Sequence, residues 1–517
     1  IEPFLTWSLH GPARVMEEGN AFQCRANYRK FLLHGVMNLP MEWHTNHHSG
    51  DVIDKIEKGA GALFAFSQYS FEIIYSFIRL FGSYLILIYF SWPAALIVLA
   101  MILVSVWITV RFDRILIGQY KRLNHAENHI SESVFDAVSN ISTVIILRVE
   151  RLVYQAIVGK IDEPYSLSQL NMRYNEWKWF LTNVCCTVMT VVVLLIYFGQ
   201  HMGSPAGEII VPLGLLYAYL RNINDVFFRF TSMYGDVIMR RAKVENAEEL
   251  ARDFIPGNLS NHVLPETWQT LEISNLTFSY QQEGASERHL DDIHLWLKRG
   301  QRVALVGKSG SGKTTVLRLM RELYQPDKLV LRVDDQDVPQ GFAGISRAIA
   351  LIPQNAEIFA TTIQDNITLG ANHTPEVIRK FTDMARFTSV IDTLPKGLQS
   401  SIKEKGVNLS GGQQQRLALS RGLLACDDKE ILLLDEPTSS QDPETEGEIF
   451  ANIFRYFHDR TIVASVHRLH LLRHFHCIYF FQDGKLLAKG TLDQLLRTCP
   501  EFSQQWEQYH NSESEIV

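Results

Sequence analysis

Long uncharged runs in the first half of the chain and a phosphate-binding motif in the second half predict two domains of different class. We expect an all-α transmembrane helical domain followed by an α/β nucleotide-binding domain. The 517 residues are enough for two or three domains. The net charge is -7, and we expect no nucleic-acid partner because such a partner favours a basic domain.

The apolar runs predict four membrane-spanning helices. Residues 80–110 contain no charged residue, and one helix needs only about 20 apolar residues to cross a bilayer. This run therefore predicts two helices that turn at Ser91-Trp92, with Pro93 in the first turn of the second helix. Two more runs begin at Trp179 and Ile209. The four predicted spans lie near residues 67–91, 93–115, 177–200 and 209–240.

Basic residues predict the orientation in the membrane. The segment 111–178 carries nine Lys and Arg, whereas the two short loops on the other side carry none. By the positive-inside rule this segment is cytoplasmic, and so is the domain that follows the helices. We expect a multi-pass protein of the plasma (bacterial inner) membrane, in contact with membrane lipid.

The fourth predicted span carries charges at Arg221, Asp225 and Arg229. Their spacing of four puts them on one helix face, and charges at membrane depth usually face a cavity or a partner. Alternatively, the helix leaves the membrane here and pairs its own charges. Arg79 poses the same choice in the first span, so Arg79, Arg221 and Asp225 are candidate cavity residues.

The histidines and cysteines predict no metal site. His44, His47 and His48 lie close enough in sequence to suggest metal ligands, but carboxylate or thiol partners are missing nearby, which favours a solvated loop. The six cysteines show neither metal spacing nor a disulfide framework. Cys185 and Cys186 are interpreted as small hydrophobic residues.

A phosphate loop, G-x-x-x-x-G-K-T, occupies residues 307–314 between an apolar strand-like run and a helical run. Its glycines let backbone N–H groups surround phosphates, Lys313 adds a positive charge, and the Thr314 hydroxyl is a ligand for Mg²⁺. The predicted ATP contacts of this loop are Gly307, Lys308, Ser309, Gly310, Ser311, Gly312, Lys313, Thr314 and Thr315.

The run "EILLLDEP" predicts a buried strand that ends in Asp435 and Glu436. Asp435 can hold Mg²⁺, and Glu436 can orient or deprotonate a water. The alternative, that Asp435 only caps the next helix, fits less well because an apolar run leads into it. The two motifs together predict a Mg²⁺-dependent nucleotide hydrolase.

The stretch "LSGGQQQR" at 409–416 adds a family resemblance. A phosphate loop, then Ser410-Gly411-Gly412-Gln413, then the Asp-Glu strand resembles the ATP-binding cassette (ABC) family, and the helical half resembles an exporter of that family. The resemblance implies an α/β P-loop NTPase domain of the ABC ATPase type. It also implies a dimer, because in such transporters the signature of one subunit closes over the ATP held by the other.

Further roles are implied by the same resemblance. Tyr280 would stack on adenine, Gln354 would touch Mg²⁺ and water, Glu436 would be the general base, and His467 would contact the γ-phosphate. Lys313 would be catalytic as well as ATP-binding.

Asp442 would lie in the loop that contacts the other cassette. Ser440 and Gln441 depart from the Ser-Ala-Leu-Asp of many relatives. Glu404, ahead of the signature, would take the acidic position of a segment that senses the membrane domain.

Segments 33–56 and 134–151 resemble the two cytoplasmic loops of exporters, whose short coupling helices rest on cassettes. Family exporters have six spanning helices, so with four predicted spans we expect the chain to begin inside the second, as a fragment or a truncated gene product. The predicted domains are a transmembrane domain at 1–247, a linker at 248–266, the cassette at 267–510 and a tail at 511–517.

The sequence therefore predicts an ATP-driven exporter or lipid flippase for an unidentified substrate, using ATP and Mg²⁺ with a second half-transporter as partner. That partner can be identical or different. Two alternatives remain: a nucleotide-gated membrane regulator or channel, and a soluble cassette ATPase. An importer is disfavoured because both halves are fused in one chain.

Overall fold

The computed structural model divides into two compact units, Ile1–Gly257 and Asn258–Val517. The division falls within the predicted linker. The structure describes residues 2–68, 70–202, 205–254, 264–265, 267–280, 288–355, 357–402 and 409–514. Most of that linker, part of the predicted tail and Glu404 lie outside the described residues.

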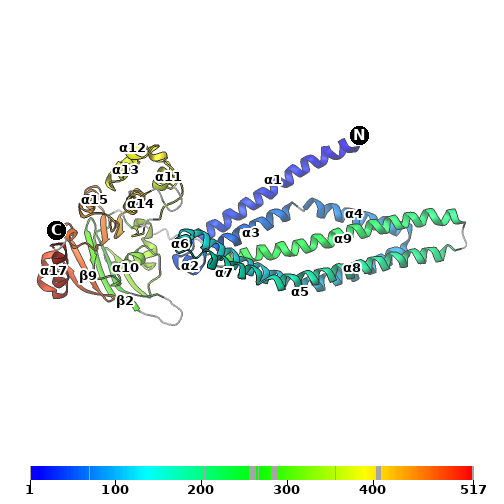
Figure 1. Cartoon of the computed structure of the whole chain (residues 1–517), viewed down its shortest axis with the longest axis horizontal. Helices are drawn as coiled ribbons and strands as arrows, with labels where there is room; N and C mark the ends of the chain where they lie inside the picture. The colour runs from blue at the N-terminus through cyan, green and yellow to red at the C-terminus, as the bar shows by residue number, and fades with distance from the viewer. Residues whose placement is uncertain are drawn as a thin grey trace. The chain divides into compact units, whose positions relative to one another are not determined.

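The first unit is helical (Figure 1). Its helices are α1 Glu2–Met37, α2 Met41–Asn46, α3 Ser49–Ser67, α4 Ser70–Phe90, α5 Trp92–Ser139, α6 Ile141–Ile146, α7 Glu150–Asp162, α8 Tyr165–Gln200 and α9 Ala206–Ala251.

The long helices of this unit lie side by side and share two apolar clusters. Helix α5 packs on α8, α3 packs on α1 and α9, and α4 packs on α9. One cluster is centred on residues such as Val98, Met189 and Leu216, and the other on Leu32 and Ile56. Pro93 lies in the first turn of α5. Backbone N–H groups of a first turn have no partner within the helix, so proline is tolerated there.

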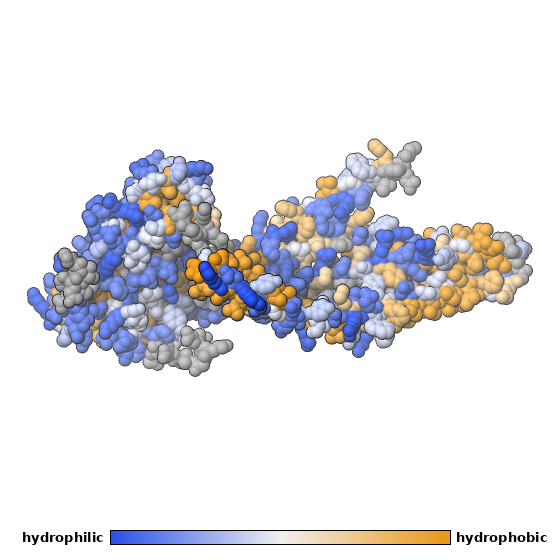
Figure 2. All heavy atoms as spheres, in the orientation of Figure 1, coloured by the Kyte–Doolittle hydropathy of each residue, from blue (hydrophilic) through white to orange (hydrophobic). Residues whose placement is uncertain are grey.

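The surface of the helical unit is strongly apolar over the ends of α4, α5, α8 and α9 farthest from α2 and α6 (Figure 2). Leu103 and Leu195, for example, are 62% and 63% exposed. Within the described residues, three helical stretches are long and apolar enough to cross a membrane: Ser49–Phe90, Trp92–Ser139 and Glu150–Gln200. The predicted fourth span falls in α9, whose charged residues make it less apolar, so that span remains a prediction.

The second unit contains two β-sheets. An antiparallel sheet has the order β2-β1-β4-β5, and a mostly parallel sheet has the order β10-β9-β3-β8-β7-β6. The strands are β1 Thr270–Ser279, β2 Arg288–Lys298, β3 Arg302–Val306, β4 Lys328–Val333, β5 Gln336–Asp337, β6 Ile349–Ile352, β7 Ile431–Asp435, β8 Thr461–Ser465, β9 Cys477–Gln482 and β10 Lys485–Gly490.

Helices and 3₁₀ turns surround these sheets. The α-helices are α10 Lys313–Met320, α11 Ile363–Thr368, α12 Pro375–Met384, α13 Thr388–Thr393, α14 Gly411–Ala425, α15 Pro443–Tyr456, α16 Leu492–Thr498 and α17 Pro500–Ser514. The 3₁₀ turns are η1 Gly341–Gly344, η2 Ser346–Ala348, η3 Gly397–Gln399 and η5 Leu469–His474.

The parallel strands decide where the polar residues of this unit meet. Strands β3, β8 and β7 are neighbours and parallel, so their carboxyl ends lie at one edge of the sheet. The phosphate loop follows β3, Asp435 ends β7, and His467 comes just after β8. Ligands of open α/β sheets bind outside such an edge.

Candidate nucleotide-binding site

The phosphate loop has a backbone shape that needs glycine. Gly307, Gly310 and Gly312 have φ angles of 154°, 80° and 103°. A Cβ atom on Gly307 would lie 2.2 Å from the Phe481 carbonyl oxygen, and one on Gly312 would lie 2.5 Å from a Leu290 methyl carbon. The loop therefore folds as a tight turn at the start of α10, where free N–H groups and the helix dipole favour a phosphate.

Lys313 is buried in this loop and bound by its carbonyl groups. Its Nζ donates to the carbonyl oxygens of Gly307 at 2.8 Å and Lys308 at 3.1 Å. Burial lowers the pKa of this ammonium group, while Glu436 and Asp435 oppose that shift. The Oγ of Ser311 is also buried, without a hydrogen-bond partner in the described structure. A charged donor and an unused hydroxyl suit the oxygens of a phosphate chain.

Two oxygen ligands lie together beside the loop. Thr314 Oγ1 donates to Asp435 Oδ1 at 2.9 Å, although the two residues are far apart in sequence. Burial raises the pKa of Asp435, and the hydrogen bond from Thr314 opposes that shift. A hydroxyl and a buried carboxylate are ligands that Mg²⁺ takes next to phosphates, so these two side chains fit that ion.

Glu436 is held in a strained backbone conformation and contacts Gln354. Its φ angle is 44°, which is uncommon for a residue with a Cβ and typical of functional sites. Gln354 Nε2 donates to Glu436 Oε2 at 2.8 Å. Glu436 and His467 line the same cavity of about 250 Å³, so the structure brings together the predicted base and the predicted γ-phosphate contact.

Tyr280 lies next to the phosphate loop. Its hydroxyl is 3.4 Å from Thr315 Oγ1, and its ring packs edge-on against Phe278 and Tyr324. The side chain is half-buried, so it can offer a ring face to a base. Adenine stacking by Tyr280 stays a prediction.

The signature residues open helix α14. Ser410 is the N-cap and forms a capping box with Gln413: the serine oxygen accepts from Gln413 N, and Gln413 Oε1 accepts from Ser410 N. Gly411 and Gly412 form the first turn, and Gly411 is exposed. The segment thus presents a capped helix N-terminus with little side-chain bulk.

A hydrogen-bond network surrounds Gln441, and no sequence pattern indicates it. This glutamine is buried, and its Nε2 donates to the Gly412 carbonyl oxygen at 2.8 Å and to Gln415 Oε1 at 3.2 Å. Gln415 also accepts from Ser440 N and donates to Ser439 Oγ, both at 3.0 Å. The departures at 440 and 441 thus connect the predicted dimer-contact loop to the signature helix.

Asp442 continues that loop as the N-cap of α15. Its carboxylate accepts from Thr445 N at 2.9 Å. The bond from Thr445 lowers the pKa of this exposed carboxyl. The side chain is therefore charged and fixed at the surface.

Comparison with known proteins decides the family. Residues 290–439 match the family described as ABC transporter, and residues 23–221 match the family described as ABC transporter transmembrane region. Both halves of one transporter therefore occur here in the expected order. The chain belongs to the ABC transporter family. It is an exporter-type half-transporter, a multi-pass membrane protein whose second unit is an ATP-binding cassette.

Relatives of this exporter have several different cargoes. It is 28% identical to the "Beta-(1-->2)glucan export ATP-binding/permease protein NdvA" of Rhodopseudomonas palustris (strain BisA53), over 89% of this chain and 76% of that protein. It is 27% identical to the "ATP-dependent lipid A-core flippase" of Pseudomonas fluorescens (strain Pf0-1), over 90% of this chain and 77% of that one.

A solved structure has the same fold. The structure described as a bacterial Atm1-family ABC exporter with ATP bound matches with a TM-score of 0.86 and 20% identity. The match covers 98% of this chain and 91% of that one.

In the helical unit of the exporter, the candidate cavity residues lie on two packed helices. Arg79 of α4 donates to Asn222 Oδ1 of α9, and Asn222 Nδ2 donates to Ser83 Oγ at 2.9 Å. Arg221 and Asp225 are exposed on α9, and no ion pair joins them within the described residues. Farther along α9, Arg241 pairs with Glu245 at 2.8 Å, so both the cavity interpretation and the helix-exit interpretation of Arg221 and Asp225 stay predictions.

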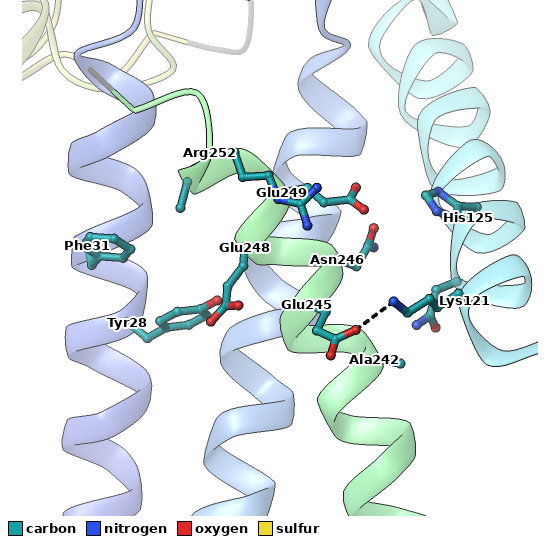
Figure 3. Close-up of a pocket in the computed structure, with 12 residues that line it drawn as sticks. Tyr28, Phe31, Lys121, His125, Ala242, Glu245, Asn246, Glu248, Glu249 and Arg252 are labelled. Carbon is teal, nitrogen blue, oxygen red and sulfur yellow. Dashed lines mark ion pairs between the residues drawn. The ribbon is translucent and has the colours of Figure 1, made fainter. Parts of the chain in front are cut away.

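A polar cavity of about 400 Å³ lies between α1, α5 and α9 (Figure 3). Lys121 Nζ pairs with Glu245 at 2.9 Å across it, and Tyr28 points toward Glu248. Burial and the nearby Glu248 raise the pKa of Tyr28 to about 12, so its hydroxyl stays a neutral donor. Sequence patterns gave no sign of this cavity because its walls come from helices far apart in the chain.

Proposed function

We propose that this chain is one half of a dimeric exporter that couples ATP hydrolysis to movement of an amphipathic or anionic substrate across the plasma (bacterial inner) membrane. The observation that carries the proposal is the convergence of Thr314, Gln354, Asp435 and Glu436 beside a complete phosphate loop. The same chain holds long apolar helices, which a soluble ATPase would not need.

In the proposed site, Lys313 and the loop N–H groups bind the β- and γ-phosphates, and the Tyr280 ring stacks on adenine. Thr314, Asp435 and Gln354 would hold Mg²⁺, which supplies charge neutralisation at the phosphates. Glu436 orients and deprotonates the attacking water, and His467 contacts the γ-phosphate side of the same cavity.

The signature residues Ser410 to Gln413 form a second phosphate-binding element, which binds the nucleotide held by the other half-transporter. Its capped helix start and small residues leave room for a phosphate, and Asp442 lies exposed in the loop predicted to face the other cassette. ATP binding would close the two cassettes, and hydrolysis would reopen them.

We also propose that the helical domain, the linker, the cassette and the tail have the bounds that the sequence predicted. The cassette would lie in the cytoplasm.

The cargo would meet Arg221 and Asp225, because exposed charges on a membrane helix face a water-filled cavity or a partner rather than lipid. The names of relatives suggest which cargo classes to test: a β-glucan, a lipid A core and, from the "Glutathione/L-cysteine transport system ATP-binding/permease protein CydD" of Bacillus subtilis (strain 168), glutathione or L-cysteine.

The test is ATPase activity of the protein in lipid nanodiscs with each cargo class added. The Glu436→Gln variant gives the background rate without catalysis. Its control is Glu376→Gln, the same substitution at an exposed helix start. Stimulation by one class, absent in Glu436→Gln, is expected. Basal activity that no compound shifts would argue against coupled export of these cargoes.

Arg221→Ala sharpens the cargo assignment. We expect it to reduce cargo-stimulated hydrolysis by roughly tenfold, about the value of one charged hydrogen bond, and to leave basal hydrolysis near the parent level. Equal loss of both activities would place Arg221 in the structure of the helix rather than in contact with cargo.

A further inference from the structure

The turn between α2 and α3 brings a histidine against two carboxylates of α5. His48 is the N-cap of α3, and its Nε2 lies 3.1 Å from Glu132 Oε1. Asp136 follows one helical turn later on the same face of α5. One ligand atom from each of the three side chains lies within 4.8 Å of the other two.

His44 and His48 are exposed to solvent as the sequence predicted, but the segment is not simply a loop and carboxylates do lie near His48. Residues 41–46 form α2, and the His47 ring stacks on Trp43 at a centroid distance of 4.0 Å. The carboxylates near His48 come from α5, far along the chain, so no local spacing could reveal them.

A glycine lets the two helices approach. Gly50 is buried in the first turn of α3, and a Cβ there would lie 3.0 Å from Phe135 Cβ and 3.2 Å from Glu132 Cα. Farther along the same contact, Lys58 pairs with Glu127 at 2.9 Å. The backbones that carry the three ligands are therefore held together by packing and do not depend on an ion.

We propose that His48, Glu132 and Asp136 bind a divalent transition-metal ion, with Zn²⁺ the best match. One imidazole nitrogen and two carboxylate oxygens suit Zn²⁺, whereas Mg²⁺ and Ca²⁺ prefer oxygen ligands alone. Ligand atoms of a tetrahedral Zn²⁺ site stand about 3.4 Å apart, so small side-chain rotations complete the site. Water takes the fourth position.

The surroundings support a metal-binding carboxylate. His129 Nδ1 lies 3.2 Å from Glu132 Oε2, the oxygen that does not face His48. A hydrogen bond to the second oxygen orients a ligating carboxylate. Because the His48 side chain is 63% exposed, an ion can reach the site from solvent.

A bound ion would join the start of α3 to the end of α5. These ends continue directly into α2 and α6, the two short helices in the segments that resemble coupling loops. Metal binding would therefore restrain residues 41–50 against residues 132–136. This consequence for coupling rests on the proposed function, whereas metal binding itself does not.

The test is Zn²⁺ titration of the purified full chain, stripped with a chelator, against a chromogenic competitor. We expect His48→Asn and Asp136→Asn to bind one Zn²⁺ fewer per chain, or to bind it at least tenfold more weakly, than the parent. The control is His44→Asn, which removes an exposed imidazole from the same segment outside the cluster. Melting temperatures without metal should agree among all four proteins, because the ligands lie at the surface.

Co²⁺ gives a second readout that does not depend on transport. The parent and His44→Asn should show the visible absorption of a four-coordinate Co²⁺ site, and His48→Asn should lose it. Equal Zn²⁺ binding by the parent, His48→Asn and Asp136→Asn would overturn the proposal. So would an equal loss in His44→Asn, which would indicate nonspecific binding along the histidine segment.

Discussion

Among the described residues, each unit of this exporter buries one lysine deeply, and the two lysines have different partners. Lys178 in the helical unit is 2% exposed and pairs with the carboxylate of Asp113 at 3.1 Å. Lys313 in the cassette is 5% exposed and is bound by two carbonyl oxygens of its own loop. The first charge is neutralised by a direct ion pair, whereas the second donates its hydrogen bonds to carbonyl oxygens and has the carboxylates of Glu436 and Asp435 only in its surroundings.

This difference in partners distinguishes a lysine that stabilises the fold from a lysine that can bind a ligand. A buried ion pair is strongly destabilised when one partner is removed, because the other charge stays buried. A buried cation that is hydrogen-bonded to carbonyl oxygens, without a direct ion pair, keeps its affinity for an anion, and the unused Ser311 hydroxyl lies in the same loop. We therefore interpret Lys178 as part of the helix packing between α5 and α8, and Lys313 as part of the phosphate site.

The two units expose different kinds of side chain, although both bury apolar clusters and some polar residues. In the helical unit, polar residues such as Asn124 and Asn128 are inside, while apolar residues cover the membrane-facing surface. In the described part of the cassette, strands β7 and β8 are completely buried. Strand β7 is apolar up to Asp435, and β8 is polar only at its two ends, Thr461 and Ser465. Lipid is the solvent for one unit and water for the other.

The largest expected effect is that of Lys313→Ala on ATP binding. Loss of charged hydrogen bonds to phosphate should weaken binding at least about 100-fold. The melting temperature without nucleotide should not fall, because burial of this ammonium group does not favour folding. Fluorescent ATP-analogue binding and thermal unfolding measure the two effects. Exposed Lys489→Ala is the control, and parent-like binding by Lys313→Ala would contradict the comparison.

Asp113→Asn should give the opposite result. It leaves the Lys178 charge buried without a carboxylate, which should lower the unfolding free energy by about 3–5 kcal/mol. ATP binding by the folded fraction should stay unchanged. Denaturant unfolding in detergent tests this, with the same change at exposed Asp162 as control.

A double replacement, Asp113→Leu with Lys178→Met, should restore most of that stability because both charges are removed. If the single change is harmless, the ion pair is not a structural element.

Gln441→Ala should have an intermediate effect. It removes the bonds to Gly412 and Gln415 and leaves buried acceptors unpaired, at a cost of about 1–3 kcal/mol. Hydrolysis should fall several-fold with unchanged nucleotide affinity, because the signature helix loses its link to the predicted dimer-contact loop. Steady-state kinetics measure both, and exposed Gln340→Ala is the control. Parent-like kinetics would show that the network does not contribute to catalysis.

The smallest effect concerns pH and Asp435. Burial raises the pKa of this carboxyl in the folded chain, so between its unfolded and folded pKa values the folded chain binds more protons. Stability of the nucleotide-free protein therefore falls as pH rises through that window. At neutral pH, Asp435→Asn should raise the melting temperature of the nucleotide-free protein by a few degrees. A lower melting temperature would contradict this account.

Local motifs explain how much of the site could be predicted. The phosphate loop and the signature each carry their geometry in a short run of residues, where glycine conformations and helix starts are decided by neighbours in sequence. The fold class, the family and the nucleotide site followed from these runs and from the length of the apolar stretches. The bounds of the spanning helices were less certain, because α5 and α8 continue far beyond the apolar residues.

Only the tertiary structure decided which distant side chains meet. Gln354 with Glu436, Lys178 with Asp113, and His48 with Glu132 each join residues from different elements. Such contacts depend on how helices and strands pack, and packing is set by many weak contacts that leave no periodic sign in the chain. By itself, the sequence therefore determined which reaction the cassette is equipped for. The packing determined which charges are paired, which await a ligand, and where a second ion can bind.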